Sequence, residues 1–231
     1  MSSLAVPAPV DRVYRFYQTT VGKKAIMAVT GLILFAFIIG HLAGNLQVFE
    51  GAAKFDAYAV FLRSLPAALW SARIILLVSV TLHIITTIQL ALLSRSARSV
   101  SYVKKDNSAA SYASRTMYWS GPIVAAFVVY HLAQFTFLIT GPVREGHPYD
   151  NVVLAFQQPL ISIFYIIAMV LLGMHLSHGI WSMLQSLGIT SPTRAPFIKS
   201  AALLIALVIT LGFISIPVAV LVGWVVPTGG N

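Results

Sequence analysis

The segment AIMAVTGLILFAFIIGHLAGNLQV, residues 25–48, decides the fold class of this chain. It contains no Asp, Glu, Lys or Arg, and a helix of this length, rising about 1.5 Å per residue, crosses a hydrocarbon layer of roughly 30 Å. Four further apolar segments follow, at residues 69–93, 117–140, 160–187 and 201–226. We therefore expect an all-α integral membrane protein, a bundle of five transmembrane helices.

The composition agrees with a membrane protein. Of 231 residues, 58% are hydrophobic and only 9% are charged, and the mean hydropathy is +0.86, which exceeds what a soluble core of this size requires. A polar arm with Asp11, Arg12 and Arg15 precedes the first apolar segment, and no small-residue cleavage pattern follows it, so a signal peptide is not expected. We expect three regions: an N-terminal arm over 1–24, a membrane domain over 25–226 and a short tail over 227–231.

The basic residues predict an orientation, because Lys and Arg accumulate in the cytoplasmic loops of membrane proteins. With five alternating spans, the side of the N-terminus collects eleven of the 15 Lys and Arg residues. We expect a multi-pass protein of a bacterial-type cytoplasmic membrane, with its N-terminus cytoplasmic and its C-terminus outside. The net charge of +9 is explained by this topology and by attraction to anionic lipid, so nucleic acid is not an expected partner.

The connections between the spans differ in character. Residues 51–68 space apolar side chains three or four apart, which predicts a short amphipathic helix at the outer interface. Residues 94–114 are polar and basic and, together with the arm, offer the largest cytoplasmic surface for a soluble partner. Residues 141–158 are rich in turn formers and are expected to form a loop.

Four histidines carry the functional prediction, because each lies inside a different apolar segment, where an ionisable ring is costly. His41 and His131 lie roughly 13 to 15 Å below the outer ends of their spans, and His83 and His175 roughly 20 to 24 Å below. The sequence therefore predicts two pairs at two depths, each binding one haem iron through two imidazoles. Such an iron has no open position and transfers electrons.

Neighbouring residues have candidate roles around these haems. Gly31 and Gly121 each precede a histidine by ten residues and are expected near the inner macrocycle, where a missing side chain allows close approach; close helix packing is the alternative. Arg73 is placed to neutralise a propionate or to snorkel. His178 shares a helical face with His175, so one ligates iron while the other donates to a propionate, a quinone or a carbonyl.

The absence of cysteine limits the chemistry of the chain. Without Cys it has neither a disulfide nor a thiolate ligand. The haems are therefore expected to be b-type and non-covalent, and any iron–sulfur cluster must belong to a partner.

Several motifs together resemble a known family. They are TGLILFAFIIGH at 30–41, AGNLQ at 43–47, RSLP at 63–66, ASRTM at 113–117, and HLSHGIWS ending in QSLGIT at 175–190. Over essentially its whole length the chain resembles the di-haem cytochrome b membrane-anchor subunit of succinate:quinone oxidoreductase (succinate dehydrogenase), the five-helix kind also found in certain fumarate reductases.

The resemblance implies a set of roles and partners. In the family, the fourth-helix ligand lies thirteen residues before the glycine that closes the motif, which corresponds to His175 here. Succinate would be oxidised on a flavoprotein subunit, and electrons would pass through an iron–sulfur subunit, both on the cytoplasmic side. They would reach the haem of His83 and His175 first, and then a membrane quinone, menaquinone or ubiquinone. No catalytic residue for succinate is expected in this chain.

One departure from the family is visible. Some fumarate-reductase members have a glutamate, proposed to conduct protons, at the position that is Gly173 here, so the succinate-oxidising direction is favoured. The quinone site has only scattered candidates, which are Arg12, Tyr14, Arg15 and Lys23 near the cytoplasm and Asn45, Gln47 and Gln134 near the outer haem.

Two alternatives stay open. One is the cytochrome b anchor of another quinone-linked dehydrogenase, against which the near-equal intervals of 42, 48 and 44 residues between ligands argue. The other is a membrane scaffold without cofactor, whose histidines form hydrogen bonds between helices.

Overall fold

The computed structural model describes residues 9–97 and 112–229, and every regular element in these ranges is helical. In chain order the elements are α1 (Pro9–Gln18), α2 (Thr20–Leu46), the 3-10 helix η1 (Gln47–Glu50), α3 (Ala52–Arg63), α4 (Pro66–Ser96), α5 (Tyr112–Phe135), α6 (Pro148–Phe156), α7 (Pro159–Ser186) and α8 (Ala195–Leu221). The all-α prediction is confirmed.

Local sequence signals explain where several helices begin and end. The helices α4, α6 and α7 all begin at a proline, whose fixed φ suits the first helical position and whose missing N–H costs nothing there. The Thr19 hydroxyl caps α2 by accepting from the Gly22 N–H at 2.9 Å. At the end of α7, Gly188 has a φ of 74°, and the Ile189 N–H bonds back to the Leu184 carbonyl, as a glycine-terminated helix requires.

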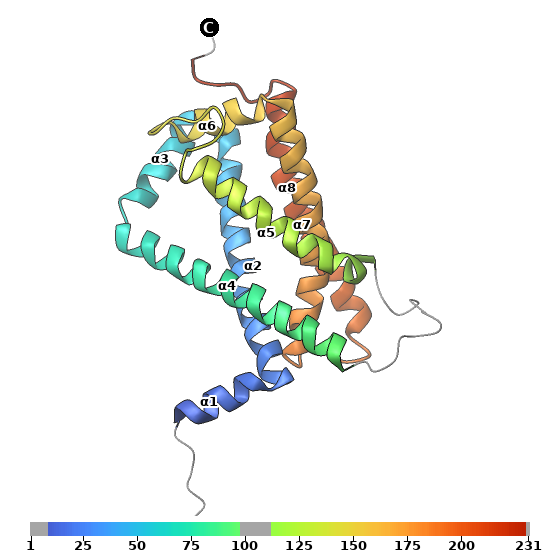
Figure 1. Cartoon of the computed structure of the whole chain (residues 1–231). Helices are drawn as coiled ribbons and strands as arrows, with labels where there is room; N and C mark the ends of the chain where they lie inside the picture. Colours follow the sequence, from blue (N-terminus) through green and yellow to red (C-terminus); the bar gives the residue numbers. More distant parts are fainter. Residues whose placement is uncertain (1–8, 98–111, 230–231) are drawn as a thin grey trace, which may run out of the picture.

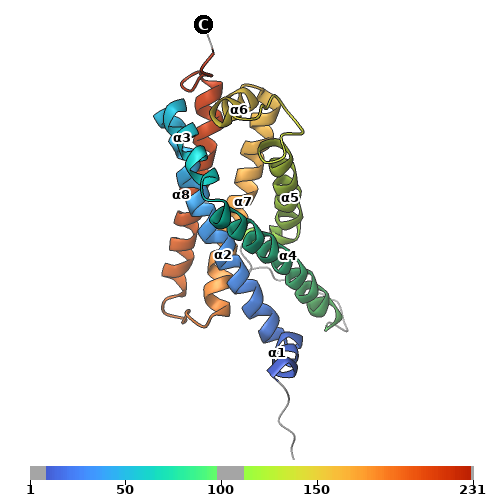
Figure 2. The ribbon, with the colours of Figure 1, turned by 90° about the vertical axis from the view of Figure 1, so that its left-hand side faces the viewer.

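The long helices form one bundle with distinct ends (Figures 1 and 2). The short helix α1 lies at one end, called the α1 end, while α3, α6 and the last described residues lie at the other, called the α6 end. In the bundle, α2 packs against α4, α7 and α8, whereas α5 packs mainly on α7, and α7 and α8 form the most extensive pair. The four histidine-bearing helices thus lie together, since α2 packs on α4 and α7, and α5 packs on α7.

Four helices, α2, α4, α7 and α8, are long and apolar enough to cross a membrane. Their outward faces expose large apolar side chains, such as Leu77 on α4 and Leu204 and Val208 on α8, which suits a lipid environment. Within the described ranges α5 does not join this group, although its 24 residues are long enough. Polar residues including Ser120, His131 and Gln134 lower its apolar character.

Two sequence predictions about the α6 end are corrected. The segment predicted as a span at 117–140 ends its helix at Phe135, and Leu138 beyond it has a left-handed φ of 54°. The expected loop at 141–158 contains the helix α6. Turn residues precede α6, but its Tyr149, Val153 and Phe156 are buried against the bundle, and this tertiary packing favours a helix.

The other connections stand as follows. The short helix expected within 51–68 is confirmed as α3. The basic connection expected at 94–114 lies mostly outside the described residues, since 98–111 are not described.

Polar contacts tie the α6 end together. The Asp56 carboxylate of α3 accepts from the Tyr149 N–H at the start of α6, at 2.9 Å. The Tyr149 hydroxyl donates to the Val226 carbonyl at 3.0 Å, and Asp150 binds Thr228. The end of the chain and α3 are therefore both attached to α6.

Candidate functional site

The four predicted histidines, each on its own helix, meet in two pairs. The ring centroids of His41 on α2 and His131 on α5 are 5.7 Å apart, with planes at 85°. Those of His83 on α4 and His175 on α7 are 6.4 Å apart, with planes at 59°. The pairs expected from helical rise alone are therefore the pairs that the fold brings together.

The two pairs lie at different levels of the bundle. His41 and His131 lie near the ends of α2 and α5 that reach the α6 end, and they are called the α6-end pair. His83 and His175 lie beyond the middle of α4 and α7, which run the opposite way, and they are called the α1-end pair. The bundle thus presents two sites in series along its length.

Aromatic rings surround the α6-end pair. Phe37 stacks on His41 at 5.2 Å, one turn before it on α2, and Phe213 of α8 lies 6.0 Å from the same imidazole. His131 contacts Phe127 and Phe135 on its own helix, at 5.9 and 5.6 Å. The surroundings of the two imidazoles are therefore largely aromatic and apolar.

Hydrogen bonding orients the His131 ring. The buried Tyr165 hydroxyl donates to Gln134 Oε1 at 2.7 Å and lies 3.4 Å from His131 Nδ1. Because the phenol proton is already used, its oxygen can only accept from Nδ1–H. This arrangement places the proton of His131 on Nδ1 and leaves the lone pair of Nε2 for a ligand.

The same arrangement occurs at His83. Thr30 Oγ1 lies 3.2 Å from His83 Nδ1, and it donates its proton within α2, to the Ile26 carbonyl at 2.8 Å. Its oxygen is therefore available to accept from the imidazole N–H. A hydroxyl already bonded elsewhere thus fixes the ring of one histidine in each pair.

Two glycines adjoin the imidazoles of the α1-end pair. A Cβ added at Gly31 would lie 3.4 Å from His83 Cε1, and one added at Gly121 would lie 3.9 Å from His175 Cε1. The sequence placed both glycines at the level of the inner pair, and this is where they lie. Any larger side chain at either position would enter the space around these rings.

The spacing of each pair is compatible with two imidazoles that share one haem iron. Imidazole nitrogens bind a metal at about 2 Å, so two rings on opposite sides of one ion have centroids roughly 6 Å apart, near the two measured values. Each pair offers two imidazole ligands. In addition, His175 Nδ1 is buried and has no hydrogen-bond partner. A macrocycle would supply the four remaining ligands.

Three further residues singled out in the sequence lie outside the two histidine pairs. His178 is half-buried on α7, and the ring that meets His83 belongs to His175 instead. The Arg73 guanidinium lies 5.0 Å from the ring of Trp70 on its own exposed helix face, which suits a snorkelling role. A Cβ at Gly173 would overlap Thr210 Oγ1, so α7 and α8 pack too closely there for a glutamate.

Two of the quinone candidates have side chains that donate to backbone carbonyls. Lys23 Nζ donates to the Tyr17 and Gln18 carbonyls, and Asn45 Nδ2 donates to the His41 carbonyl. Gln134 Nε2 differs, since it is buried without a partner. Arg12, Tyr14 and Arg15 lie on α1, and Gln47 lies in η1.

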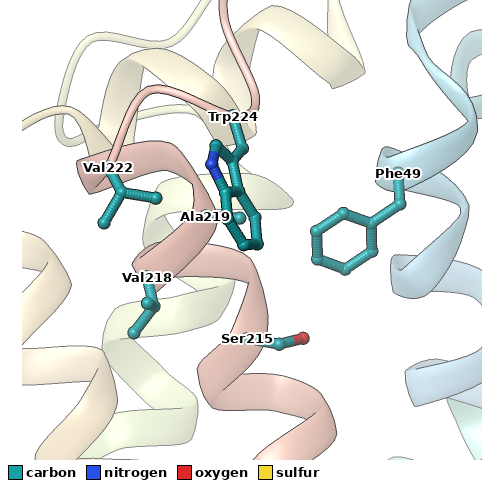
Figure 3. A pocket seen from close by; sticks show the side chains of 6 residues that line it. All are labelled: Phe49, Ser215, Val218, Ala219, Val222 and Trp224. Atoms are coloured by element: carbon teal, nitrogen blue, oxygen red, sulfur yellow. The ribbon is translucent and has the colours of Figure 1, made fainter.

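A small apolar pocket opens at the α6 end (Figure 3). Its volume is about 300 Å³, and it is lined by Phe49, Ser215, Val218, Ala219, Val222 and Trp224. The Ser215 hydroxyl already donates to the Gly212 carbonyl. Among the lining residues, Trp224 has the one side-chain N–H donor, its indole. A quinone site needs apolar walls and a few polar groups that orient the ligand. This pocket has the apolar walls but few polar groups.

Sequence reasoning missed Thr30 and Tyr165 as partners of the histidines. Thr30 lies in the motif at 30–41, one residue before Gly31. No sequence pattern indicates that it contacts His83, because His83 lies on another helix. Tyr165 is one of several aromatic residues in its segment, and only the packing of α5 on α7 singles it out.

Comparisons of the chain with protein-family models, curated proteins and solved structures gave no match.

Proposed function

We propose that the chain is a di-haem cytochrome b that anchors a succinate:quinone oxidoreductase to a membrane. The observation that carries the proposal is the meeting of four histidines from four helices in two pairs, at two levels. Bound haem supplies a one-electron Fe(II)/Fe(III) couple. Two such sites in series suit electron transfer along the bundle.

Residues of this chain would bind each haem iron, orient the imidazoles and leave room for the macrocycle. His41 and His131 would hold one iron, and His83 and His175 the other. Thr30 and Tyr165 keep the Nε2 atoms of their histidines available. Gly31 and Gly121 leave room beside the α1-end pair.

The membrane arrangement belongs to the same proposal. We infer that α5 is a fifth span, because it provides His131 and packs along the spanning helix α7. With the N-terminus cytoplasmic, the α1 end faces the cytoplasm, and the α1-end pair receives electrons first. The motif resemblance supplies the rest of the proposal, namely a flavoprotein and an iron–sulfur partner and a membrane quinone as acceptor.

Haem stoichiometry tests the core of the proposal. The full chain, expressed with adequate haem supply and purified in detergent, should give close to two non-covalent haems per polypeptide by the pyridine haemochrome assay. A colourless protein would support the scaffold alternative, and a value near one would remove the two-pair scheme. Co-purification with a flavoprotein that reduces dye with succinate separates this family from other cytochrome b anchors.

A further inference from the structure

The helix α1 presents an apolar face that the described protein does not cover. Val13 is 70% exposed, Tyr14 63% and Phe16 51%. With 3.6 residues per turn, Val13, Tyr14 and Tyr17 share one face, and Phe16 borders it. Asp11 and Arg15 lie on the opposite face.

The direction of the apolar face is fixed by Tyr17. Its hydroxyl donates to Gln89 Oε1 on the spanning helix α4, at 2.9 Å. The face that contains Tyr17 therefore points toward the spanning helices, and Val13 and Tyr14 point the same way. In a membrane, lipid surrounds the spanning helices at that level.

The angle between α1 and α2 is also fixed. Lys23 is only 5% exposed, and its Nζ donates to the Tyr17 and Gln18 carbonyls at 3.0 and 3.2 Å, which satisfies carbonyls at the end of α1. Thr19 Oγ1 donates to the Phe16 carbonyl at 2.7 Å. This corner turns α1 sideways from the end of α2, away from α7 and α8, as Figure 1 shows.

We propose that α1 is an interfacial helix that lies in the surface layer of the same membrane. Its apolar face is buried among the parts of the acyl chains next to the headgroups, while Arg12 and Arg15 lie among anionic headgroups. A lipid surface fits better than a soluble protein, because the uncovered side chains point toward the bundle and away from the aqueous phase. A soluble partner at this end would meet the opposite face of α1.

The absence of cysteine gives a clean test. Single cysteines at Asp11, Val13, Tyr14 and Arg15 would be spin-labelled in the full chain, reconstituted in phosphatidylglycerol vesicles. The accessibility of each label to oxygen, which concentrates in lipid, is compared with its accessibility to a water-soluble nickel chelate. Leu204→Cys, on the exposed face of α8, and Glu145→Cys, in an exposed loop, give the lipid and water references.

The labels at Val13 and Tyr14 should resemble the Leu204 reference, and those at Asp11 and Arg15 the Glu145 reference. Equal nickel access at all four positions would overturn the proposal, and so would protection of Val13 and Tyr14 from both reagents, which would indicate a protein cover. Exchange of phosphatidylglycerol for phosphatidylcholine, or Arg12→Gln with Arg15→Gln, should raise nickel access at Val13. An unchanged value would overturn the role given to the two arginines.

Discussion

Thr30 Oγ1 lies 3.2 Å from His83 Nδ1, where α2 packs against α4. Tyr165 stands in the same relation to His131, on the other pair of helices. In both cases the hydroxyl proton is directed to a carbonyl oxygen, so the imidazole Nδ1–H donates to that hydroxyl and Nε2 carries the lone pair. A purely structural histidine could use either nitrogen, whereas a ligand must keep one lone pair available.

The Thr30 contact is tested by Thr30→Val, which keeps the shape and removes the acceptor. An acceptor at Nδ1 makes the imidazole more basic and stabilises oxidised iron, so its loss should raise the midpoint potential of the haem on His83 and His175. A tenfold change in the ratio of oxidised to reduced haem corresponds to about 59 mV. Redox titration followed by absorbance measures the shift. Thr30→Ser should restore the original value, and a shift in the other haem would contradict the assignment.

Tyr165→Phe should have a larger effect on the α6-end pair. It removes the acceptor of His131 and also leaves the buried Gln134 Oε1 without its donor, which costs about 1–3 kcal/mol. We expect a raised potential for the haem on His41 and His131, together with a lower melting temperature. Phe164→Leu, a neighbouring change without a hydroxyl, is the control. Equal potentials in wild type and Tyr165→Phe would show that Tyr165 is only structural.

The glycine contacts predict a selective loss of haem. Alanine at position 31 would place its Cβ at ordinary contact distance from His83, whereas Gly31→Val adds methyl groups that must displace the ring. Gly31→Val should therefore reduce the haemochrome value from two to one and abolish the haem on the α1-end pair. Gly40→Ala on the same helix is the matched control, because its added Cβ would meet nothing within 4 Å. Retention of both haems in Gly31→Val would leave helix packing as the role of this glycine.

The pairing of the four histidines could be predicted from the sequence, because the position of a residue along a helix axis follows directly from its residue number. Once the spans are known, the rise per residue places His41 level with His131 and His83 level with His175. The same calculation placed Gly31 and Gly121 at the level of the α1-end pair. These predictions required no side-chain contact between helices.

The features that were missed depend on tertiary contacts. The helix α6 forms from a segment rich in turn residues because Asp56, distant in sequence, accepts from the Tyr149 N–H and the core buries Val153. Beyond the end of α5, Leu138 has a left-handed backbone, a conformation that leucine rarely adopts and no pattern predicts. The roles of Thr30 and Tyr165 likewise arise only when helices pack.

The tail contact predicts a response to acid at the α6 end. Asp150 accepts from the Thr228 N–H at 2.9 Å and from its hydroxyl at 2.7 Å. The backbone bond and the hydroxyl bond lower the pKa of Asp150 below its ordinary value, although partial burial opposes them. A lowered pKa in the folded state means that the contact is stable above the ordinary value of about 3.9 and is lost as the pH falls through the folded value. A spin label at Gly229→Cys should therefore become more mobile in acid. In an Asp150→Asn background its mobility should not depend on pH in this range.

The strongest prediction concerns which histidines act together. In the proposed arrangement each iron would need both imidazoles of its pair, so His41→Ala and His131→Ala should abolish the same haem, and His83→Ala and His175→Ala the other. His178→Ala should retain both, because the ring that meets His83 comes from His175. Low-temperature spectra and redox titration of each purified variant identify the haem that remains. Loss of a haem in His178→Ala, with retention in His175→Ala, would assign the α7 ligand to His178. Loss of different haems in His41→Ala and His131→Ala would show that the contact between these rings does not correspond to shared ligation.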